Sequence, residues 1–234
     1  MLSSRARVPL NQAGWVVPLP DGLSLEEAMV LGTAGFTAML SELALERNGL
    51  RPEQGPVLVT GATGGVGSTA IGILARTGYQ VTASSGKPDM KDFLTKLGAG
   101  EILSREDVVD ESPKVMIKEQ WAGAVDTTGG GTLEYLLRTV KTGGGVALSG
   151  MVHGHAFSTT VYPFILRGVN LLGIDSVNCP MEPRLEAWAR LAGELKPANL
   201  GDIARMIALD DLPGKLKEIL DGGARGRYVL KLGA

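Results

Sequence analysis

A glycine-rich loop between two apolar segments carries the most specific chemical signal in the sequence. The apolar run Pro56–Thr60 is typical of a strand buried on both faces, and Gly61–Gly67 follows it at the start of an apolar helical pattern. A side chain at Gly64 or Gly65 would keep backbone N–H groups away from an anion, whereas Gly67 would let the helix pack close to the strand. The helix N-terminus adds about half a positive charge. The pattern predicts a site for the pyrophosphate of a dinucleotide; the alternative is that the glycines only form turns.

The end of the next predicted strand indicates which dinucleotide is bound. About 20 residues past the first loop glycine, an Asp or Glu would accept hydrogen bonds from the ribose hydroxyls of NAD. The sequence instead has Ser84–Lys87, which brings two hydroxyls and a cation to the place of the NADP 2′-phosphate. NADP is therefore preferred. Two alternatives stay open: Asp89 could turn inward and favour NAD, and Lys87 could be a solvated surface side chain.

Further polar residues follow other predicted strands, on the sheet edge where open α/β folds bind ligands. Asp126–Gly129 and Ser149–Met151 are two such segments, and turn formation explains them equally well. Arg105 could stack on adenine or meet the 2′-phosphate, or it could be an exposed arginine that does neither. His153 and His155 are candidates for a general acid near the nicotinamide, against the alternative of loop histidines without a partner.

The composition excludes several classes of function. The 234 residues carry 23 Lys and Arg against 25 Asp and Glu, and this balance offers no excess positive charge to nucleic acid or an anionic membrane. One cysteine, Cys179, cannot form an internal disulfide, and with two histidines the chain cannot assemble the common zinc sites, so no metal is expected. The start, Met1–Arg5, lacks the long apolar core of a secretory signal, so it does not indicate export. No stretch of the sequence reaches the ~20 uncharged apolar residues that a membrane span needs. A reducing, cytoplasmic location fits these features.

Helical and strand patterns alternate along the chain. Ser24 and Glu27 form a capping box at the start of a helix that extends to Arg47, and Gly32 and Gly35 should divide this helix. The elements predicted after it are strand 56–60, helix 66–77, strand 80–84, helix 90–97, strands 101–103 and 123–126, helix 132–140, strand 145–149, helix 161–167 and strand 170–174. This alternation predicts an α/β fold, a doubly wound Rossmann sheet of parallel strands with helices on both faces.

Several separated motifs, in consistent order and spacing, make the sequence similar to a known family. They are the segments Gly32–Leu40, Thr60–Ser68, Ser85–Lys87, Trp121–Thr127, Pro163–Arg167 and Gly173–Ser176. Together they resemble the zinc-independent medium-chain dehydrogenases/reductases, most of all the acrylyl-CoA reductase and quinone oxidoreductase group. The main competing Rossmann enzymes, the short-chain dehydrogenases, need a Tyr-x-x-x-Lys pair, and no tyrosine in this sequence has a lysine four residues on.

The resemblance implies an NADPH-dependent oxidoreductase that reduces the C=C bond of an α,β-unsaturated substrate. Acrylyl-CoA is favoured, with hydride going to the β-carbon and a proton to the α-carbon, while quinones and enones stay open as acceptors. No catalytic residue is assigned. The residues that match cofactor-binding positions are Thr63, Gly64, Gly65, Val66 and Gly67 at the pyrophosphate, Ser85, Gly86, Lys87 and Arg105 around the adenosine phosphate, and Met151, Ile165, Ser176 and Arg227 near the nicotinamide half or the cleft wall.

The resemblance also implies a second, β-rich domain of the GroES-like type, which in family members supplies much of the substrate cleft. Segments 5–18 and 226–232 have strand patterns outside any βαβ unit and are similar to parts of that domain. We therefore expect a remnant of the GroES-like domain at residues 1–22 and a Rossmann NADP-binding domain at 23–176. Residues 177–234 should form C-terminal helices and a strand that returns to the GroES-like domain.

Two functional expectations follow from this division. With much of the substrate half missing, a shortened chain should bind NADPH but turn over weakly or not at all by itself. The alternative is a non-catalytic NADP(H)-binding module or subunit. The resemblance further implies a homodimer, in which the strand at 170–174 pairs with its copy across a two-fold axis.

Overall fold

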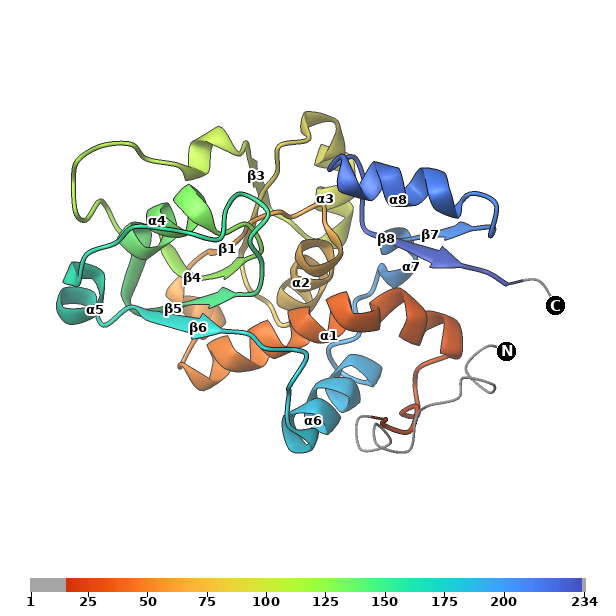
Figure 1. The fold of residues 1–234 in the computed structure, drawn as a ribbon. Coiled ribbons are helices and arrows are strands. Elements are labelled where there is room, and N and C mark those ends of the chain that lie inside the picture. The colour runs from red at the N-terminus through yellow and green to blue at the C-terminus, as the bar shows by residue number, and fades with distance from the viewer. Residues whose placement is uncertain (1–15, 233–234) are drawn as a thin grey trace.

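A six-stranded sheet with all its strand pairs parallel forms the centre of the computed structural model, which describes residues 16–232 (Figure 1). The strands are β1 (Val57–Val59), β2 (Val81–Ser84), β3 (Glu101–Leu103), β4 (Trp121–Asp126), β5 (Val140–Leu148) and β6 (Asn170–Gly173). Their order, β3-β2-β1-β4-β5-β6, grows in one direction from β1 and in the other from β4. The predicted doubly wound α/β fold is confirmed.

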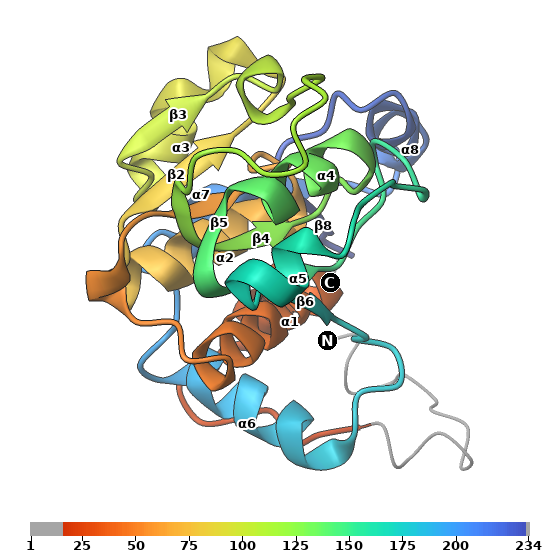
Figure 2. The same ribbon diagram turned by 90° about the vertical axis from the view of Figure 1, so that its left-hand side faces the viewer.

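Helices cover both faces of this sheet because alternate strand residues point to opposite sides. The helices are α1 (Leu25–Arg47), α2 (Gly65–Arg76), α3 (Lys91–Leu97), α4 (Gly130–Thr139), α5 (Tyr162–Arg167), α6 (Met181–Ala192), α7 (Leu200–Ile203) and α8 (Leu212–Leu220), with 3-10 turns at Pro52–Gln54, Pro88–Met90 and Glu106–Val108. Val57 and Val59 join an apolar core with α1, α2 and α3, whereas Leu58 joins a second core with α4. Both views place α6 beside α1, away from the sheet (Figures 1 and 2).

Helix α1 contains one of the two predicted breaks. The predicted capping box is present: the Ser24 hydroxyl accepts from the N–H of Glu27 at 3.1 Å, and the Glu27 carboxylate accepts from the N–H of Ser24 at 2.8 Å. Gly32 has φ 49° and ψ −153°, so the helix kinks there, whereas Gly35 stays helical. A Cβ at Gly32 would lie 2.6 Å from Nη2 of Arg227. Glycine therefore both permits the kink and leaves room for this guanidinium.

Strands β4 and β5 are longer than the sequence pattern predicted. They begin at Trp121 and Val140, and these two residues pair before the register shifts to the pair formed by Gly123 and Gly145. The glycines at 143–145 hid the start of β5, because a residue without a side chain has a low strand propensity and no apolar face. The pairing with β4 nevertheless holds the chain extended through this segment.

The C-terminal part forms a βαβ unit of its own. Strand β7 (Ala204–Ile207) is followed by α8 and by β8 (Arg227–Leu230), and β7 and β8 pair in parallel. The prediction that the strand at 226–232 lies outside any βαβ unit was therefore wrong. It failed because β7 is only four residues long, includes the charged Arg205 and follows α7 directly, so it gave no separate strand signal.

Two other expectations about the chain ends lie largely beyond the described residues. Residues 1–15, which hold most of the predicted strand at 5–18, are outside the described part, and residues 16–18 are not in a strand. The predicted boundaries at 22/23 and 176/177 stay predictions. Helix α1 is long and apolar enough by composition to cross a membrane, but 72% of its most apolar window is buried inside the protein. Burial of this kind is typical of a core helix.

The first turn of α2 packs directly against the loop that precedes it. A Cβ at Gly67 would lie 2.5 Å from the carbonyl oxygen of Gly61 and 2.8 Å from Cα of Ala62. Both neighbours are backbone atoms, so neither can rotate away. The helix reaches this position only because residue 67 has no side chain.

We predict that Gly67→Ala destabilises the protein by about 1–3 kcal/mol, the cost of overpacking a site that cannot relax. Gly131→Ala is the matched control, because Gly131 also lies in the first turn of a helix and a Cβ there meets no atom within 4 Å. The control should be neutral or slightly stabilising, since alanine favours helix. Urea unfolding measures both variants; equal stability of the two would contradict the packing account.

Glu42 is a carboxyl group buried in the core-facing side of α1. Neither of its carboxyl oxygens has a hydrogen-bond partner in the described structure. Burial, and then the negative charge of Glu46, raise the pKa of Glu42 to about 8, although the Arg190 guanidinium acts in the opposite direction. Arg190 is itself bound to Glu46, with 3.0 Å between Nη2 and Oε1. Glu42 is therefore protonated in the folded protein at neutral pH.

Replacing Glu42 with glutamine should change how stability depends on pH. Between the ordinary pKa of 4.5 and the folded value of about 8, the folded protein holds a proton at Glu42 that the unfolded chain has lost. The wild type therefore loses up to about 1.4 kcal/mol of stability per pH unit over this window, and Glu42→Gln removes that loss. Urea unfolding at pH 5, 6.5 and 8 should show a stability difference that grows in favour of the variant. A difference that stays constant across these pH values would contradict the prediction.

Candidate functional site

The carboxyl ends of the central strands border a cavity of about 580 Å³. Loops after β1, β2, β3, β4 and β5 line it, together with a segment just before β8 and the start of β8 itself. It lies at the point where the strand order reverses, between β1 and β4, which is where open α/β sheets bind ligands. The predicted site residues that line it are Thr63, Gly64, Gly65, Val66, Gly67, Ser85, Gly86, Lys87, Arg105 and Arg227.

The glycine loop presents backbone to this cavity. Gly64 is the N-cap of α2 and offers no side chain to the first N–H groups of the helix, which have no partners within the helix itself. A Cβ at Gly65 would lie 2.9 Å from Cδ of Arg227 and 3.0 Å from Cβ of Ala34. In this loop glycine keeps the backbone accessible at the N-terminus of α2, and the binding of a pyrophosphate there stays a prediction.

A cationic region lies at the end of β2. The Ser85 hydroxyl accepts from the N–H of Lys87 at 3.1 Å, which fixes the turn. The Lys87 ammonium donates to the carbonyl of Ala224, and burial lowers its pKa. Arg105 lies across Gly86, where a Cβ would be 2.5 Å from Nη2. Asp89 is exposed and does not line the cavity, so within residues 16–232 no acid follows β2 in the position that favours NAD.

The segment before β8 closes one side of the cavity. The N–H of Gly226 donates to the carbonyl of Thr63 at 2.8 Å, which joins this segment to the glycine loop. Arg227 follows, and its burial lowers the pKa of its guanidinium. None of the ion pairs formed within the described part of the chain includes Arg227. A half-buried cation beside the N-terminus of α2 makes this side of the cavity positive.

Sequence reasoning placed Arg227 in the site but missed the segment before β8 that lines the cavity beside it. Gly226 has φ +58°, and a Cβ on it would overlap the carbonyl of Ile203. The glycines at 222, 223 and 226 are the signal that could have indicated a close backbone approach here.

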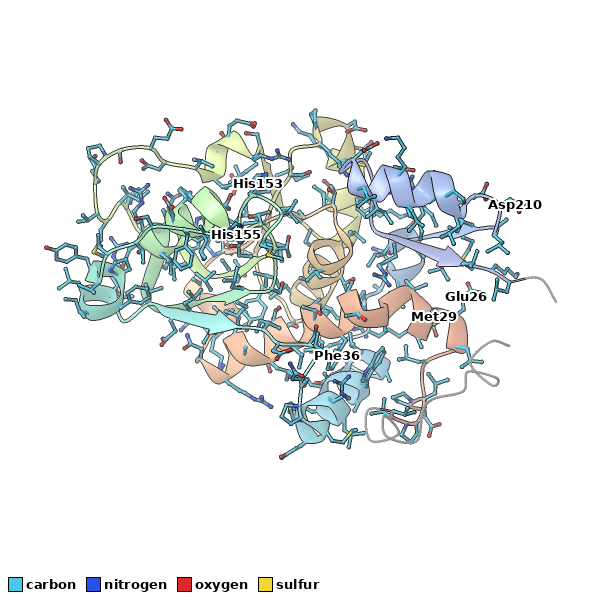
Figure 3. All side chains as sticks on the ribbon, viewed as in Figure 1. Glu26, Met29, Phe36, His153, His155 and Asp210 are labelled. Carbon is cyan, nitrogen blue, oxygen red and sulfur yellow. The ribbon has the colours of Figure 1, made fainter. Side chains whose placement is uncertain are left out.

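Three other predicted residues do not reach the cavity. Met151, Ile165 and Ser176 are absent from its lining, and the first two are 70% and 68% exposed. His153 lines the cavity, whereas His155 does not; both lie on the loop after β5 (Figure 3). Burial and then the positive charge of Arg105 lower the pKa of His153, while the charge of Asp126 acts in the opposite direction.

Across residues 16–232, no group of three or more His, Cys, Asp or Glu side chains is arranged to hold a metal ion.

A family model described as zinc-binding dehydrogenase matches residues 65–192, which is more than half of the chain. The chain is 54% identical over 232 residues to YhfP of Bacillus subtilis (strain 168), whose name describes it as a candidate quinone oxidoreductase; the match covers 99% of this chain and 69% of YhfP. It is 49% identical over 223 residues to the acrylyl-CoA reductase AcuI of Ruegeria pomeroyi, covering 95% of this chain and 68% of AcuI.

Solved structures agree with these matches. The structure of Bacillus subtilis YhfP with NAD bound matches this chain with a TM-score of 0.91, and the match covers 94% of this chain and 67% of the YhfP chain. The YhdH oxidoreductase of Salmonella enterica, solved in complex with NADP, is 47% identical, with a TM-score of 0.91 and coverage of 94% of this chain and 68% of that chain. The chain therefore belongs to the family whose model is described as zinc-binding dehydrogenase. Within this family it belongs to the zinc-independent medium-chain dehydrogenase/reductase group, which contains acrylyl-CoA reductases and quinone oxidoreductases.

Proposed function

We propose that the cavity binds NADP(H) and that the chain serves the reduction of the C=C bond of an α,β-unsaturated substrate, with acrylyl-CoA as the favoured acceptor. The observation that carries the proposal is the presence, in the lining of one cavity, of a glycine cradle at the N-terminus of α2 and of two cations, Lys87 and Arg105. Relatives of known structure were solved with NAD or NADP bound, and a close relative is named an acrylyl-CoA reductase. Both findings support this assignment.

Each part of the cavity fits one part of the dinucleotide. The N–H groups at Thr63–Gly67 would hold the pyrophosphate, with the half-buried Arg227 guanidinium as a second source of positive charge. Ser85–Lys87 and Arg105 would surround the 2′-phosphate, because hydroxyls and cations are the usual phosphate partners. This assignment moves Arg227 from the nicotinamide half, where the resemblance suggested it, to the pyrophosphate.

The chemistry of the reaction comes from the cofactor, which supplies a hydride when bound. The chain's own residues bind and orient it. His153, a predicted candidate for the general acid, lies close enough to Arg105 for the charge of Arg105 to lower the His153 pKa. His153 therefore lies near a residue assigned to the adenosine phosphate rather than to the nicotinamide, so we assign His153 no catalytic role.

We predict that the chain binds NADPH more tightly than NADH and that Arg105→Met removes most of this preference. A charge-assisted hydrogen bond to phosphate contributes about 1.5–3 kcal/mol, so the dissociation constant for NADPH should rise tenfold or more while that for NADH stays the same. Lys91→Met is the control, since Lys91 is an exposed lysine outside the cavity. Calorimetric titration of the wild type and both variants with each nucleotide measures all six constants. Tighter binding of NADH by the wild type would overturn the NADP assignment.

Turnover is measured with the same protein. NADPH consumption with acrylyl-CoA, and with a quinone as the competing acceptor, distinguishes the reductase from a non-catalytic NADP(H)-binding module. Oxidation of NADPH with saturation of the C=C bond supports the reductase, even at a low rate. Tight NADPH binding with neither acceptor reduced would favour the module instead.

We further propose that the chain forms a homodimer through β6. In the described sheet β6 pairs with β5 on one side only, so its other edge presents unpaired backbone N–H and C=O groups. Ile165 and Leu166 on the adjacent α5 are 68% and 64% exposed, which adds apolar surface beside this edge. Analytical ultracentrifugation at micromolar concentration should show a dimer, and a monomer would contradict the proposal.

A further inference from the structure

Asp126 is the last residue of β4, and its carboxylate is completely buried behind the cavity wall. None of the ion pairs among residues 16–232 includes it. A buried carboxylate without a cation is costly unless hydrogen bonds replace the water it has lost. At Asp126 hydrogen bonds do replace this water, and the residues that donate them show which segments of the chain Asp126 holds together.

The donors come from two loops. From the end of β1, the Thr60 hydroxyl donates to Oδ1 at 2.6 Å. From the turn between β4 and α4, the Thr128 N–H donates to Oδ1 at 2.9 Å and the Thr128 hydroxyl at 2.7 Å. The N–H of Gly129 lies 3.2 Å from Oδ2. A single carboxylate therefore binds both loops at once.

Thr127 strengthens this connection. Its N–H donates to the Thr60 hydroxyl oxygen at 3.0 Å, and its hydroxyl donates to the Thr60 carbonyl at 3.0 Å. The Thr60 hydroxyl can accept the first of these bonds in this orientation because its own proton points at Asp126. The carboxylate thus sets the orientation of Thr60, and Thr60 in turn holds Thr127.

These hydrogen bonds lie at the carboxyl ends of β1 and β4, where the backbone pairing between the two strands stops. The N–H of Thr60 makes the last backbone contact between β1 and β4, with the carbonyl of Val125 at 3.0 Å. Beyond this contact the segments that follow β1 and β4 diverge, because α2 packs on one face of the sheet and α4 on the other. Ligands bind in the crevice opened by this divergence. Side-chain bonds centred on Asp126 are what fix the width of the crevice.

We infer that Asp126 is a positioning residue for the dinucleotide, an inference that rests on the proposed function. Asp126 does not line the cavity, whereas Thr60, Thr127 and Thr128 do. It therefore acts on the ligand through the spacing between the glycine loop and the β4–α4 turn. The adenosine end of the site, at Ser85–Lys87, lies beyond β2 and makes no hydrogen bond to this network in the described structure.

Asp126→Asn tests the inference, because it keeps the shape of the side chain, removes its negative charge and replaces one of its two acceptor oxygens with an NH2 group that cannot accept from the surrounding donors. We expect the dissociation constant for NADPH to rise at least tenfold. The fragment 2′,5′-ADP, which would occupy only the adenosine end, should keep its wild-type affinity within about twofold. A purely structural loss would weaken both ligands together, so parallel losses would overturn the inference, as would unchanged NADPH binding.

Further variants cover the case in which Asp126→Asn does not fold. Thr60→Val removes the donor to Asp126 and should weaken NADPH but not 2′,5′-ADP, whereas Thr60→Ser keeps the hydroxyl and should retain NADPH affinity. Thr139→Val is the matched control: Thr139 is equally buried, and its hydroxyl bonds only within α4. Equal NADPH affinity of Thr60→Val and Thr60→Ser would overturn the inference. Failure of the wild type to bind NADPH would instead reject the proposed function.

Discussion

The site depends on backbone segments that approach one another more closely than side chains would permit. At the end of β1 the chain turns through Gly61, where a Cβ would overlap the Thr127 hydroxyl, and after β5 a Cβ at Gly150 would overlap the Thr127 carbonyl. Gly67 then lets α2 begin against the loop itself. These contacts bring the N-terminus of α2 to the cavity edge, so that its partial positive charge and its N–H groups face the ligand.

Positively charged side chains are the second feature of the cavity, beside the close backbone contacts at glycine. The chain as a whole carries a formal net charge of −2, yet Lys87, Arg105 and Arg227 all line the cavity. Any attraction of the cavity for an anion therefore comes from this local arrangement rather than from the overall field of the protein. The C-terminal βαβ unit contributes to the cavity, because the segment before β8 is hydrogen-bonded to both Thr63 and Lys87. The candidate dinucleotide site is thus built from the Rossmann sheet and from the βαβ unit that follows it in the chain.

Features that depend on neighbouring residues were predictable from the sequence. The glycine loop, the capping box at Ser24 and the strand-helix alternation follow from short-range patterns, and the structure confirms all three. Features that depend on distant contacts were not. Gly32 and Gly35 look equivalent in the sequence, but only Gly32 adjoins Arg227 and breaks the helix. The β7 strand is defined by its pairing with β8, which no local pattern reveals.

Buried acids show the same limit. Nothing in the sequence separates Glu42 from surface carboxylates, although it has no hydrogen-bond partner in the described structure. The sequence placed Asp126 at the ligand-binding edge of the sheet but did not indicate that its carboxylate is surrounded by donors. Met151 and Ile165 show the converse, since similarity suggested a place in the site and the structure leaves them exposed outside the cavity.

A crystal structure of this chain with NADPH tests the central claim most directly. The account predicts a pyrophosphate hydrogen-bonded to the N–H groups of the glycine loop at the start of α2, with the 2′-phosphate against Lys87 and Arg105. A dinucleotide bound elsewhere, or a pyrophosphate that makes no contact with this loop, would contradict it.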